Sequence, residues 1–394
     1  MWPPLRLRIG WRKRNGPPVP DTETYLVSFS GEIGIKAPAT RRALEELTLK
    51  SFLTRAGVLG LSPKVEPFWG RILLSGPRDL ERLLATQAGF GRWGYFRETW
   101  DPTLLPERPF TYVVYVDRVE PRESFSEALA QKRALLELLE KEARRNLSSW
   151  DNYPPERLEI RLEVRRWRLF YLINPRPALG GFPPGASGRG LVLFSGGPDS
   201  LLATLFLLRR GLLPALIFFD DGEAGRAEAV QELVREVAFF FPEMAVEFFQ
   251  VEFREALEFI ASRVATRERC FFCKAAMLRL AGEILSQEGF SVVATGEILG
   301  EQASQTLPAL LFTARAAGVP LLRPLLGLNK EEVFERLSAL GLKEAAFRRL
   351  PACPWAPDHP HTLPRSRPET LGSLWPAIRK RVKKIERKIL SRKG

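Results

Sequence analysis

Residues 191–200 read LVLFSGGPDS, and this stretch decides how the second half of the chain folds. Its first four residues are apolar, which is typical of a strand that is buried on both faces of a sheet. Two glycines and a proline follow, and an apolar run that favours a helix then extends from Ser200 to Gly211. A buried strand, a glycine turn and a helix in direct succession predict the first unit of a parallel α/β sheet.

The same alternation continues towards residue 340. Further apolar strands are predicted at 214–219, 245–251, 291–294 and 319–323, and helices at 224–241, 274–287, 303–317 and 330–340. We therefore expect an α/β domain with a parallel, Rossmann-like sheet covered by helices on both faces. Such sheets bind ligands beyond the carboxyl ends of their strands.

The first half of the chain predicts two small α+β units. One has strands at 24–29 and 71–74 with helices at 40–56 and 77–86; the other has strands at 111–116 and 158–171 around a helix at 126–146. The Pro- and Gly-dense stretch 174–190 indicates a domain boundary. The expected segments are a basic extension (1–22), the α+β units (23–100 and 101–178), the α/β domain (179–375) and a basic C-terminal helix (376–394).

Composition excludes several classes of protein. A chain of 394 residues that is 45% hydrophobic and 27% charged has enough apolar material for a folded core. No apolar run approaches the roughly 20 residues of a membrane span, and the N-terminus lacks the apolar segment of a secretory signal. The 3 cysteines exclude a disulfide scaffold and fit a reducing compartment. We expect a cytoplasmic protein without membrane contact.

The net charge of +13 is concentrated at the two ends of the chain. Apolar residues recur at three- and four-residue steps from 371 to 389, with lysines and arginines between them. This spacing predicts one helix of about five turns with a basic ridge. We expect the ridge to bind nucleic-acid phosphates, although charges that only keep the protein in solution would give the same pattern.

The glycine turn is also a candidate phosphate site. Gly196 and Gly197 allow the backbone to approach a phosphate chain, and the hydroxyls of Ser195 and Ser200 add hydrogen-bond donors. Asp199 could hold Mg²⁺ or position the reacting groups. The alternative is a tight turn in which Ser or Asp caps the helix. The complete block between strand and helix favours ATP binding.

SGGPDS resembles the pyrophosphate loop of the PP-loop ATPases, which adenylate a carbonyl. Four other stretches resemble the ThiI-type tRNA 4-thiouridine synthetases: SGEIGIKAPATRR (30–42), ATGEILGEQASQTL (294–307), RPLLGLNKEEV (323–333) and CPWAPDHPHT (353–362). The resemblance covers about residues 25–362. It is weakest over 97–170, where the family has its tRNA-binding THUMP domain.

This resemblance implies a ferredoxin-like domain and a THUMP-like domain that hold tRNA, followed by a PP-loop domain. The PP-loop domain would adenylate the uridine at position eight with ATP, and a sulfur nucleophile would displace AMP to leave 4-thiouridine. Asp199 and Lys330 match two polar positions that the family uses in adenylation. The family's ATP contacts fall on Leu193, Phe194, Phe218, Phe219, Gly296, Gln305 and either Lys274 or Arg279. By residue type alone, the two phenylalanines would be sheet core and Lys330 an exposed lysine.

All three cysteines lie in the α/β domain. Cys270 and Cys273 form a C-x-x-C pair, and Cys353 lies in a Pro-rich stretch. Three cysteines suit a [4Fe–4S] cluster with one iron free of protein ligands. The chain also resembles the subgroup of the family that has three cysteines in these places. Zinc with His359 or His361 as fourth ligand, a persulfide relay through Cys353, and buried structural thiols are the alternatives.

Many members of this family carry a rhodanese domain that delivers sulfur. The stretch after His361 is too short for one, so we expect another sulfur donor, either a cysteine desulfurase or free sulfide. We also expect tRNA as partner and consider a homodimer. Alternative functions are another PP-loop tRNA modification (2-thiolation or lysidine synthesis) and an inactive tRNA-binding protein.

Overall fold

The computed structural model describes residues 22–102, 105–106, 110–146, 156–348, 350 and 353–392. The extension predicted for 1–22 lies outside these residues, apart from Thr22. The described chain divides into two compact units. One comprises residues 38–59 and 181–394, and the other comprises 12–37 and 60–180 within the described ranges.

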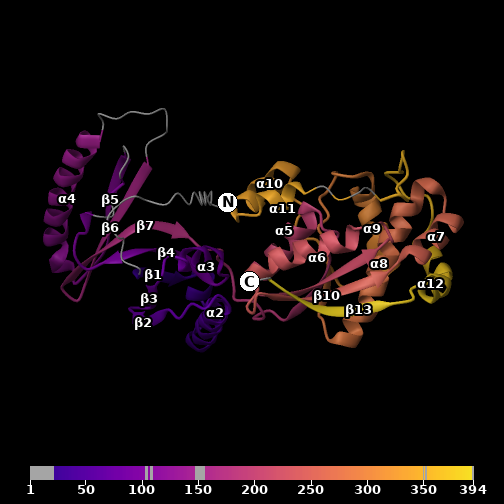
Figure 1. The fold of residues 1–394 in the computed structure, drawn as a ribbon, viewed down its shortest axis with the longest axis horizontal. Coiled ribbons are helices and arrows are strands. Elements are labelled where there is room, and N and C mark those ends of the chain that lie inside the picture. Colours follow the sequence, from indigo (N-terminus) through magenta and orange to yellow (C-terminus); the bar gives the residue numbers. More distant parts are fainter. Residues whose placement is uncertain are drawn as a thin grey trace. The chain divides into compact units, whose positions relative to one another are not determined.

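The second of these, the N-terminal unit, is built on a seven-stranded sheet in the order β2-β3-β1-β4-β7-β6-β5 (Figure 1). Its strands are β1 (Glu23–Phe29), β2 (Lys64–Phe68), β3 (Arg71–Gly76), β4 (Phe90–Arg97), β5 (Phe110–Glu120), β6 (Glu156–Arg165) and β7 (Arg168–Pro177). Its helices are α1 (Gly31–Gly34), α3 (Leu80–Thr86), η2 (Arg122–Ser124) and α4 (Phe125–Asn146). The pairing of β4 with β7 joins the strands of both predicted α+β units into one sheet. The boundary between those units therefore stays a prediction.

One prediction in this unit is wrong. Residues 158–171 are not a single strand but the two arms of the β6–β7 hairpin. The chain reverses at Arg166 and Trp167, whose φ angles are +47° and +66°. These residues lack the Asn-Gly signature of such a turn, so the sequence pattern gave no sign of the reversal.

The larger unit contains a six-stranded sheet in the order β12-β11-β8-β9-β10-β13. Its strands are β8 (Arg189–Leu193), β9 (Leu213–Asp220), β10 (Ala245–Glu252), β11 (Val292–Ala294), β12 (Leu321–Leu322) and β13 (Ile385–Ser391). The first five are parallel, which confirms the predicted α/β class and its parallel PP-loop sheet.

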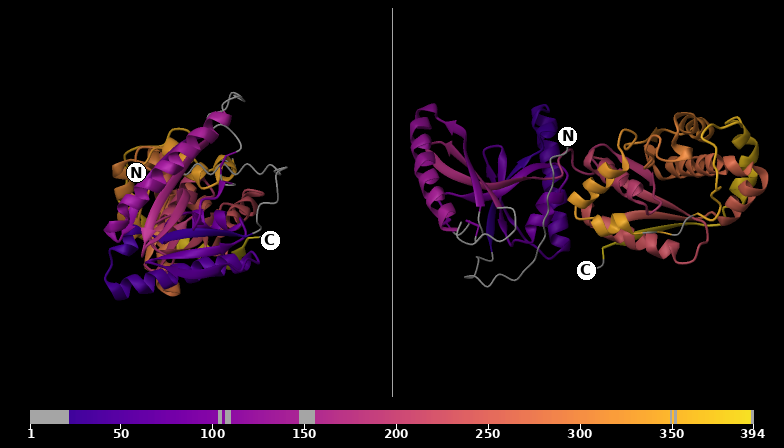
Figure 2. Two further views of the ribbon diagram at one scale, coloured as in Figure 1. Left: turned by 90° about the vertical axis from the view of Figure 1, so that its left-hand side faces the viewer. Right: turned by 90° about the horizontal axis from the view of Figure 1, so that it is seen from above.

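Helices cover both faces of this sheet (Figures 1 and 2). On one face, alternate residues of β9 (Ala215, Ile217 and Phe219) pack with α7, α8, α9 and α12. The other face is covered by α5 and α6, with α10 and α11 packed on α5. The bounds are α5 (Pro198–Arg209), α6 (Arg226–Val237), α7 (Arg254–Arg263), α8 (Arg269–Glu288), α9 (Leu307–Ala317), α10 (Lys330–Ala339), α11 (Lys343–Phe347) and α12 (Thr370–Lys380), with short turns η3 (Ala238–Phe240), η4 (Thr266–Glu268) and η5 (Ala303–Gln305). Helix α2 (Pro38–Val58) groups with this unit, where Arg55 donates to the Phe239 carbonyl oxygen.

The predicted C-terminal helix is also wrong beyond Lys380. Leu371, Trp375 and Ile378 do form the buried stripe of α12, but residues 385–391 form β13, antiparallel to β10. Strand β10 would otherwise be the edge of the sheet, and pairing satisfies its backbone groups. In the strand, Leu390 is buried while Ile389 is 63% exposed, which is a two-residue period. Among the described helices, none is long and apolar enough to cross a membrane.

Candidate functional site

The phosphate loop connects β8 to α5 at the carboxyl edge of the parallel sheet. Helix α5 begins with Gly197 in an extended N-cap conformation and Pro198 in the first turn, an arrangement that leaves backbone N–H groups free at its start. Gly196 has φ +78°, and a Cβ there would meet Leu350 at 2.6 Å. The Ser200 hydroxyl donates to the Gly197 carbonyl oxygen at 2.9 Å, which fixes the loop. The predicted strand–loop–helix geometry is therefore present.

Gly296 lies against this loop. A Cβ at residue 296 would be 2.5 Å from the carbonyl carbon of Asp199 and 2.7 Å from the amide nitrogen of Ser200. Only glycine lets the segment that follows β11 approach the first turn of α5 so closely. Gly296 thus allows the end of β11 to lie against the first turn of α5.

Asp199 and Lys330 form an ion pair. The Lys330 ammonium lies 2.7 Å and 2.8 Å from the two carboxylate oxygens of Asp199. Lys330 begins α10, whose start is fixed by a capping box between Asn329 and Glu332. A cation at a helix start opposes the helix dipole, and the nearby carboxylate offsets that cost. The pair places one positive and one negative group on the phosphate loop.

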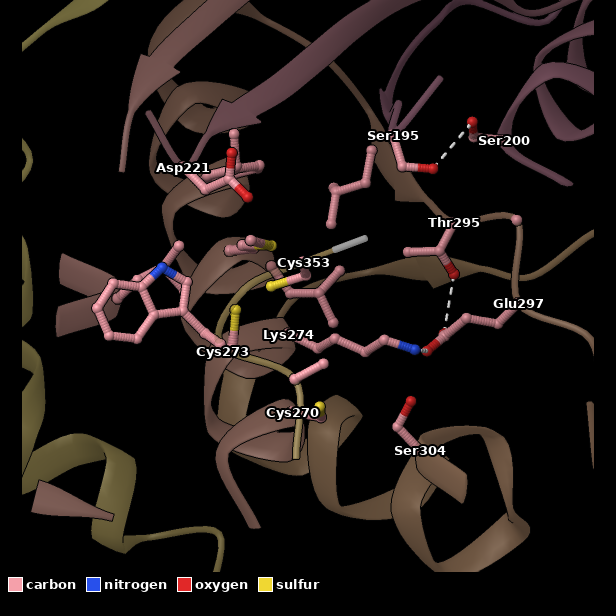
Figure 3. A pocket seen from close by; sticks show the side chains of 18 of the residues that line it. Ser195, Ser200, Asp221, Cys270, Cys273, Lys274, Thr295, Glu297, Ser304 and Cys353 are labelled. Carbon is pink, nitrogen blue, oxygen red and sulfur yellow. Dashed lines mark hydrogen bonds and ion pairs between the residues drawn. The ribbon is translucent and has the colours of Figure 1, made fainter. Parts of the chain in front are cut away.

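A cavity of about 480 Å³ opens beside the loop and contains most of the predicted site (Figure 3). Ten predicted nucleotide and catalytic residues line it: Leu193, Phe194, Ser195, Asp199, Ser200, Phe218, Phe219, Lys274, Gly296 and Gln305. The thiol-bearing residues Cys270, Cys273 and Cys353 line the same cavity. The fold therefore brings the phosphate loop and the three cysteines to one place.

Four predicted residues do not line this cavity. Gly196 and Gly197 form the backbone of the loop, and Lys330 reaches it through Asp199. Arg279 lies elsewhere, with its guanidinium 5.0 Å from the centre of the Trp375 ring. Of the two basic candidates, only Lys274 is placed to contact a ligand in the cavity.

The sequence did not single out Glu297. This residue is 5% exposed and its carboxylate accepts from Lys274 at 3.3 Å, Arg323 at 2.7 Å and Thr295 at 2.9 Å. Burial alone would raise the pKa of Glu297, but Lys274, Arg323 and the hydrogen bonds hold it below the usual value. The ionised carboxylate orients the Lys274 ammonium. Figure 3 shows the Lys274 side chain ending beside the Glu297 carboxylate. A polar residue directly after a strand-end glycine was the signal available in the sequence.

A second buried pair, Asp221 and Arg226, also lines the cavity and was not predicted. Asp221 follows the end of β9 and Arg226 begins α6. The Asp221–Arg226 pair and the residues around Glu297 place polar groups on the side of the cavity where the parallel strands end. The wall also contains apolar residues, among them Leu257, Ile260 and Met277.

The three thiols approach one another across the cavity. Cys270 and Cys273 lie one turn apart at the start of α8, and Cys353 comes from the segment that precedes α12. Burial raises the pKa of Cys273, and the Cys353 and Cys270 thiols add to the rise. Burial also raises the pKa of Cys270, which Lys274 partly offsets. These thiols are therefore close enough for their charges to interact, and none is in a disulfide.

No group of three or more His, Cys, Asp or Glu side chains is arranged as a ready metal site among the residues that the structure describes. Neither His359 nor His361 lines the cavity. The backbone N–H of His361 donates to the Arg267 carbonyl oxygen at 2.9 Å, and its Nδ1 is buried without a hydrogen-bond partner. The histidine required by the zinc alternative is therefore absent from the cavity lining.

The matches to known proteins agree with one another. Residues 185–371 match the family model described as thiamine biosynthesis protein (ThiI). A probable tRNA sulfurtransferase of Aeropyrum pernix is 29% identical over 376 residues, covering 90% of this chain and 91% of that protein. The tRNA sulfurtransferase of Pseudomonas aeruginosa is 35% identical over 199 residues, covering 49% of this chain and 40% of that protein.

A solved structure has the same fold over nearly the whole chain. The crystal structure of a 4-thiouridine synthetase–RNA complex with bound ATP matches with a TM-score of 0.73 at 23% identity, covering 94% of this chain and 100% of that one. The match over residues 185–371, the probable tRNA sulfurtransferases of similar length and this shared fold agree with the motifs around the cavity, and the chain is similar to the ThiI-type tRNA sulfurtransferases.

Proposed function

We propose that this chain is an enzyme that thiolates tRNA with ATP, converting the uridine at position eight into 4-thiouridine. One observation carries the proposal: a phosphate loop and three cysteine thiols line the same cavity. Activation by ATP and delivery of sulfur must act on the same carbonyl group in turn. The residues that bind ATP and those that deliver sulfur therefore have to lie close together. The matches to the ThiI family model and to a probable tRNA sulfurtransferase support the same reaction, and a 4-thiouridine synthetase solved with RNA and ATP has the same fold.

In the first step, O4 of the uridine attacks the α-phosphate of ATP and pyrophosphate leaves. The free N–H groups at the start of α5 bind the pyrophosphate, because a helix start attracts anions. Lys330 and Lys274 supply positive charge to the phosphates as the transition state forms. Mg²⁺ would accompany ATP, and Asp199 is the carboxylate in the loop able to hold it.

Gln305 is suited to bind the nucleotide. Its side chain is 5% exposed and lines the cavity, and its Oε1 is buried without a hydrogen-bond partner. Leaving a buried acceptor unpaired costs roughly 1–3 kcal/mol, which a donor on ATP would recover. The exocyclic amine of adenine and the ribose hydroxyls are such donors.

In the second step, sulfur attacks C4 of the adenylated uridine and AMP leaves. We propose a [4Fe–4S] cluster for these thiols, because all three line one cavity and a cation would relieve the repulsion between their thiolates. Cys270, Cys273 and Cys353 would hold it. Bound there, it would offer an iron without a protein ligand to sulfide. A persulfide on Cys353 stays the alternative, formed when the Cys353 thiolate takes the outer sulfur of a cysteine desulfurase persulfide and releases the desulfurase thiol. Free sulfide would be a donor only for the cluster route.

For tRNA we propose the N-terminal unit as the main binding surface. The β6–β7 turn exposes 67% of Trp167 beside the exposed Arg166. Exposed aromatic rings stack on unpaired bases and arginines bind phosphates. A homodimer and a cytoplasmic location, where tRNA and ATP are available, stay part of the proposal.

The test is nucleoside analysis of tRNA from cells that lack the gene, complemented with the wild type or with Asp199→Ala. We expect 4-thiouridine with the wild type and none with the variant. Lys330→Ala should also lower the 4-thiouridine level. Lys343→Ala is its matched control, because both lysines begin a helix but Lys343 is exposed and does not line the cavity. A wild-type level of 4-thiouridine with Asp199→Ala would refute the assignment, whereas 2-thiouridine or lysidine as the lost nucleoside would favour the other PP-loop activities. An RNA-binding protein without activity would give no ATP-dependent product.

A further inference from the structure

Residues 353–369 form a long segment without helix or strand between α11 and α12. This segment carries Cys353, together with Trp355 and Ala356, into the cavity. Inside the segment, the Ala356 N–H donates to the Cys353 carbonyl oxygen at 3.2 Å. Trp355 packs against the core of the larger unit two residues from Cys353, so the position of the thiol depends on this packing and on what holds the rest of the segment.

Glu268 holds its far end. The carboxylate accepts from the backbone N–H groups of Arg365 and Ser366, the latter at 3.1 Å, and from the Ser366 hydroxyl at 2.6 Å. Glu268 is 4% exposed, so these contacts are shielded from water. Three donors on one buried carboxylate make a strong attachment, because hydrogen bonds to charged groups are stronger than those between neutral groups.

Arg267, the residue before it, holds the middle of the segment. Its Nε donates to the His359 carbonyl oxygen at 2.7 Å, and its carbonyl oxygen accepts from the His361 N–H at 2.9 Å. Both residues belong to η4, which runs directly into α8. Cys270 follows Glu268 by two residues, so the element that holds the Cys353 segment also carries the other two thiols.

We propose that Glu268 is a positioning residue for the sulfur step, which keeps the Cys353 thiol beside Cys270 and Cys273. The inference rests on the proposed function in that it takes these thiols to carry the sulfur chemistry. Glu268 supplies three of the five hydrogen bonds by which Arg267 and Glu268 hold the connection between α11 and α12, so its loss lengthens the part of this connection that is free to move. The effective concentration of its thiol at the cavity would then fall, because a longer free loop samples more positions.

The first experiment measures the thiols without ATP, tRNA or metal. In metal-free protein with Cys273→Ala, the pair Cys270 and Cys353 remains, and the rate of disulfide formation with diamide is followed by peptide mass spectrometry. We expect Glu268→Ala to slow this rate about tenfold, in line with the loss of effective concentration. Glu268→Gln, which keeps an acceptor, should fall between. Glu283→Ala is the matched control, because Glu283 links the same helix α8 to Trp375 and Arg379 of α12 and should leave the rate unchanged.

Limited trypsin digestion reports on the segment itself. Arg365 is exposed, and its bond to Ser366 lies within the attachment, so Glu268→Ala should speed cleavage there. If Glu268→Ala does not fold, Ser366→Ala removes one donor alone and should give a smaller shift of the same sign. A wild-type disulfide rate in the folded variants would overturn the proposal, whether or not cleavage becomes faster. Since neither readout involves tRNA thiolation, this failure is distinct from a failure of the proposed function.

Discussion

Removing the Glu297 carboxylate should destabilise the larger unit and free the Lys274 ammonium from its ion pair. In Glu297→Ala, Arg323 keeps its hydrogen bonds to the Leu310 carbonyl oxygen at 3.0 Å and to Thr313, but it loses its counter-charge. Breaking one partner of a buried ion pair costs about 3–5 kcal/mol, because the remaining charge stays out of water. For a domain of this size, about 1 kcal/mol lowers the Tm by about 2–4 °C, so we expect a fall of about 6–20 °C.

The dependence on pH gives a second test with a definite sign. The pKa of Glu297 is below its ordinary value in the folded protein, so the folded state favours the ionised form. This contribution to stability is fully present above the unfolded pKa of about 4.3 and is lost as the pH falls through the folded pKa. The difference in Tm between wild type and Glu297→Ala should therefore be constant from about pH 6 to 8 and shrink in acid.

Thermal unfolding followed by circular dichroism measures both effects. Glu301→Ala is the matched control, because Glu301 is exposed in the same segment. Glu297→Gln should lose less stability than Glu297→Ala, since it retains hydrogen-bond partners. A fall of less than about 2 °C at pH 7, which corresponds to about 1 kcal/mol or less, would refute the reasoning. A difference that persists unchanged in acid would show that charge is not its cause.

Three further outcomes follow from the cavity. Lys274→Ala should weaken ATP binding about tenfold, as expected for the loss of a charge-assisted contact, while Arg279→Ala leaves it unchanged in calorimetry; equal losses would contradict the placement of Arg279 on Trp375. Gly296→Ala should lower both Tm and ATP affinity, because its Cβ would lie 2.5 Å from a backbone atom of Asp199, and wild-type values for both would contradict this close approach. Cys353→Ala should lower the iron and acid-labile sulfide of anaerobically purified protein, and stoichiometric zinc without iron in the wild type would refute the cluster.

Local sequence patterns predicted the parallel sheet and its phosphate loop well. The strand, the two glycines and the helix of 191–209 are determined by neighbouring residues, so a short window contains the whole signal. The β6–β7 turn and strand β13 could not be predicted from a short window of sequence. A two-residue reversal at Arg166 and Trp167 has no typical turn residue, and β13 forms because β10 offers an unpaired edge that no local pattern reveals.

The same limit applies to the basic C-terminal segment. Its spacing predicted an outward ridge, but many of its cations have acidic partners: Arg379 with Glu283, Lys383 with Glu255, and Arg387 with both Glu247 and Glu288. A cation that is already paired releases fewer counterions on binding RNA. The segment is therefore less suited to hold tRNA than its composition indicated, and exchanging these cations for Gln should leave the salt dependence of tRNA binding nearly unchanged.

The cavity also explains how one site can activate a carbonyl and then protect the activated product. Its strand-end side holds Lys274 and the buried pairs around Glu297 and Asp221, so negative charge on phosphates is stabilised there. Cys270 and Cys273 lie on α8 beside Lys274, and burial raises the pKa of both thiols. The three thiols therefore share one cavity with the phosphate loop, and the position of Cys353 within it depends on the segment that Arg267 and Glu268 hold.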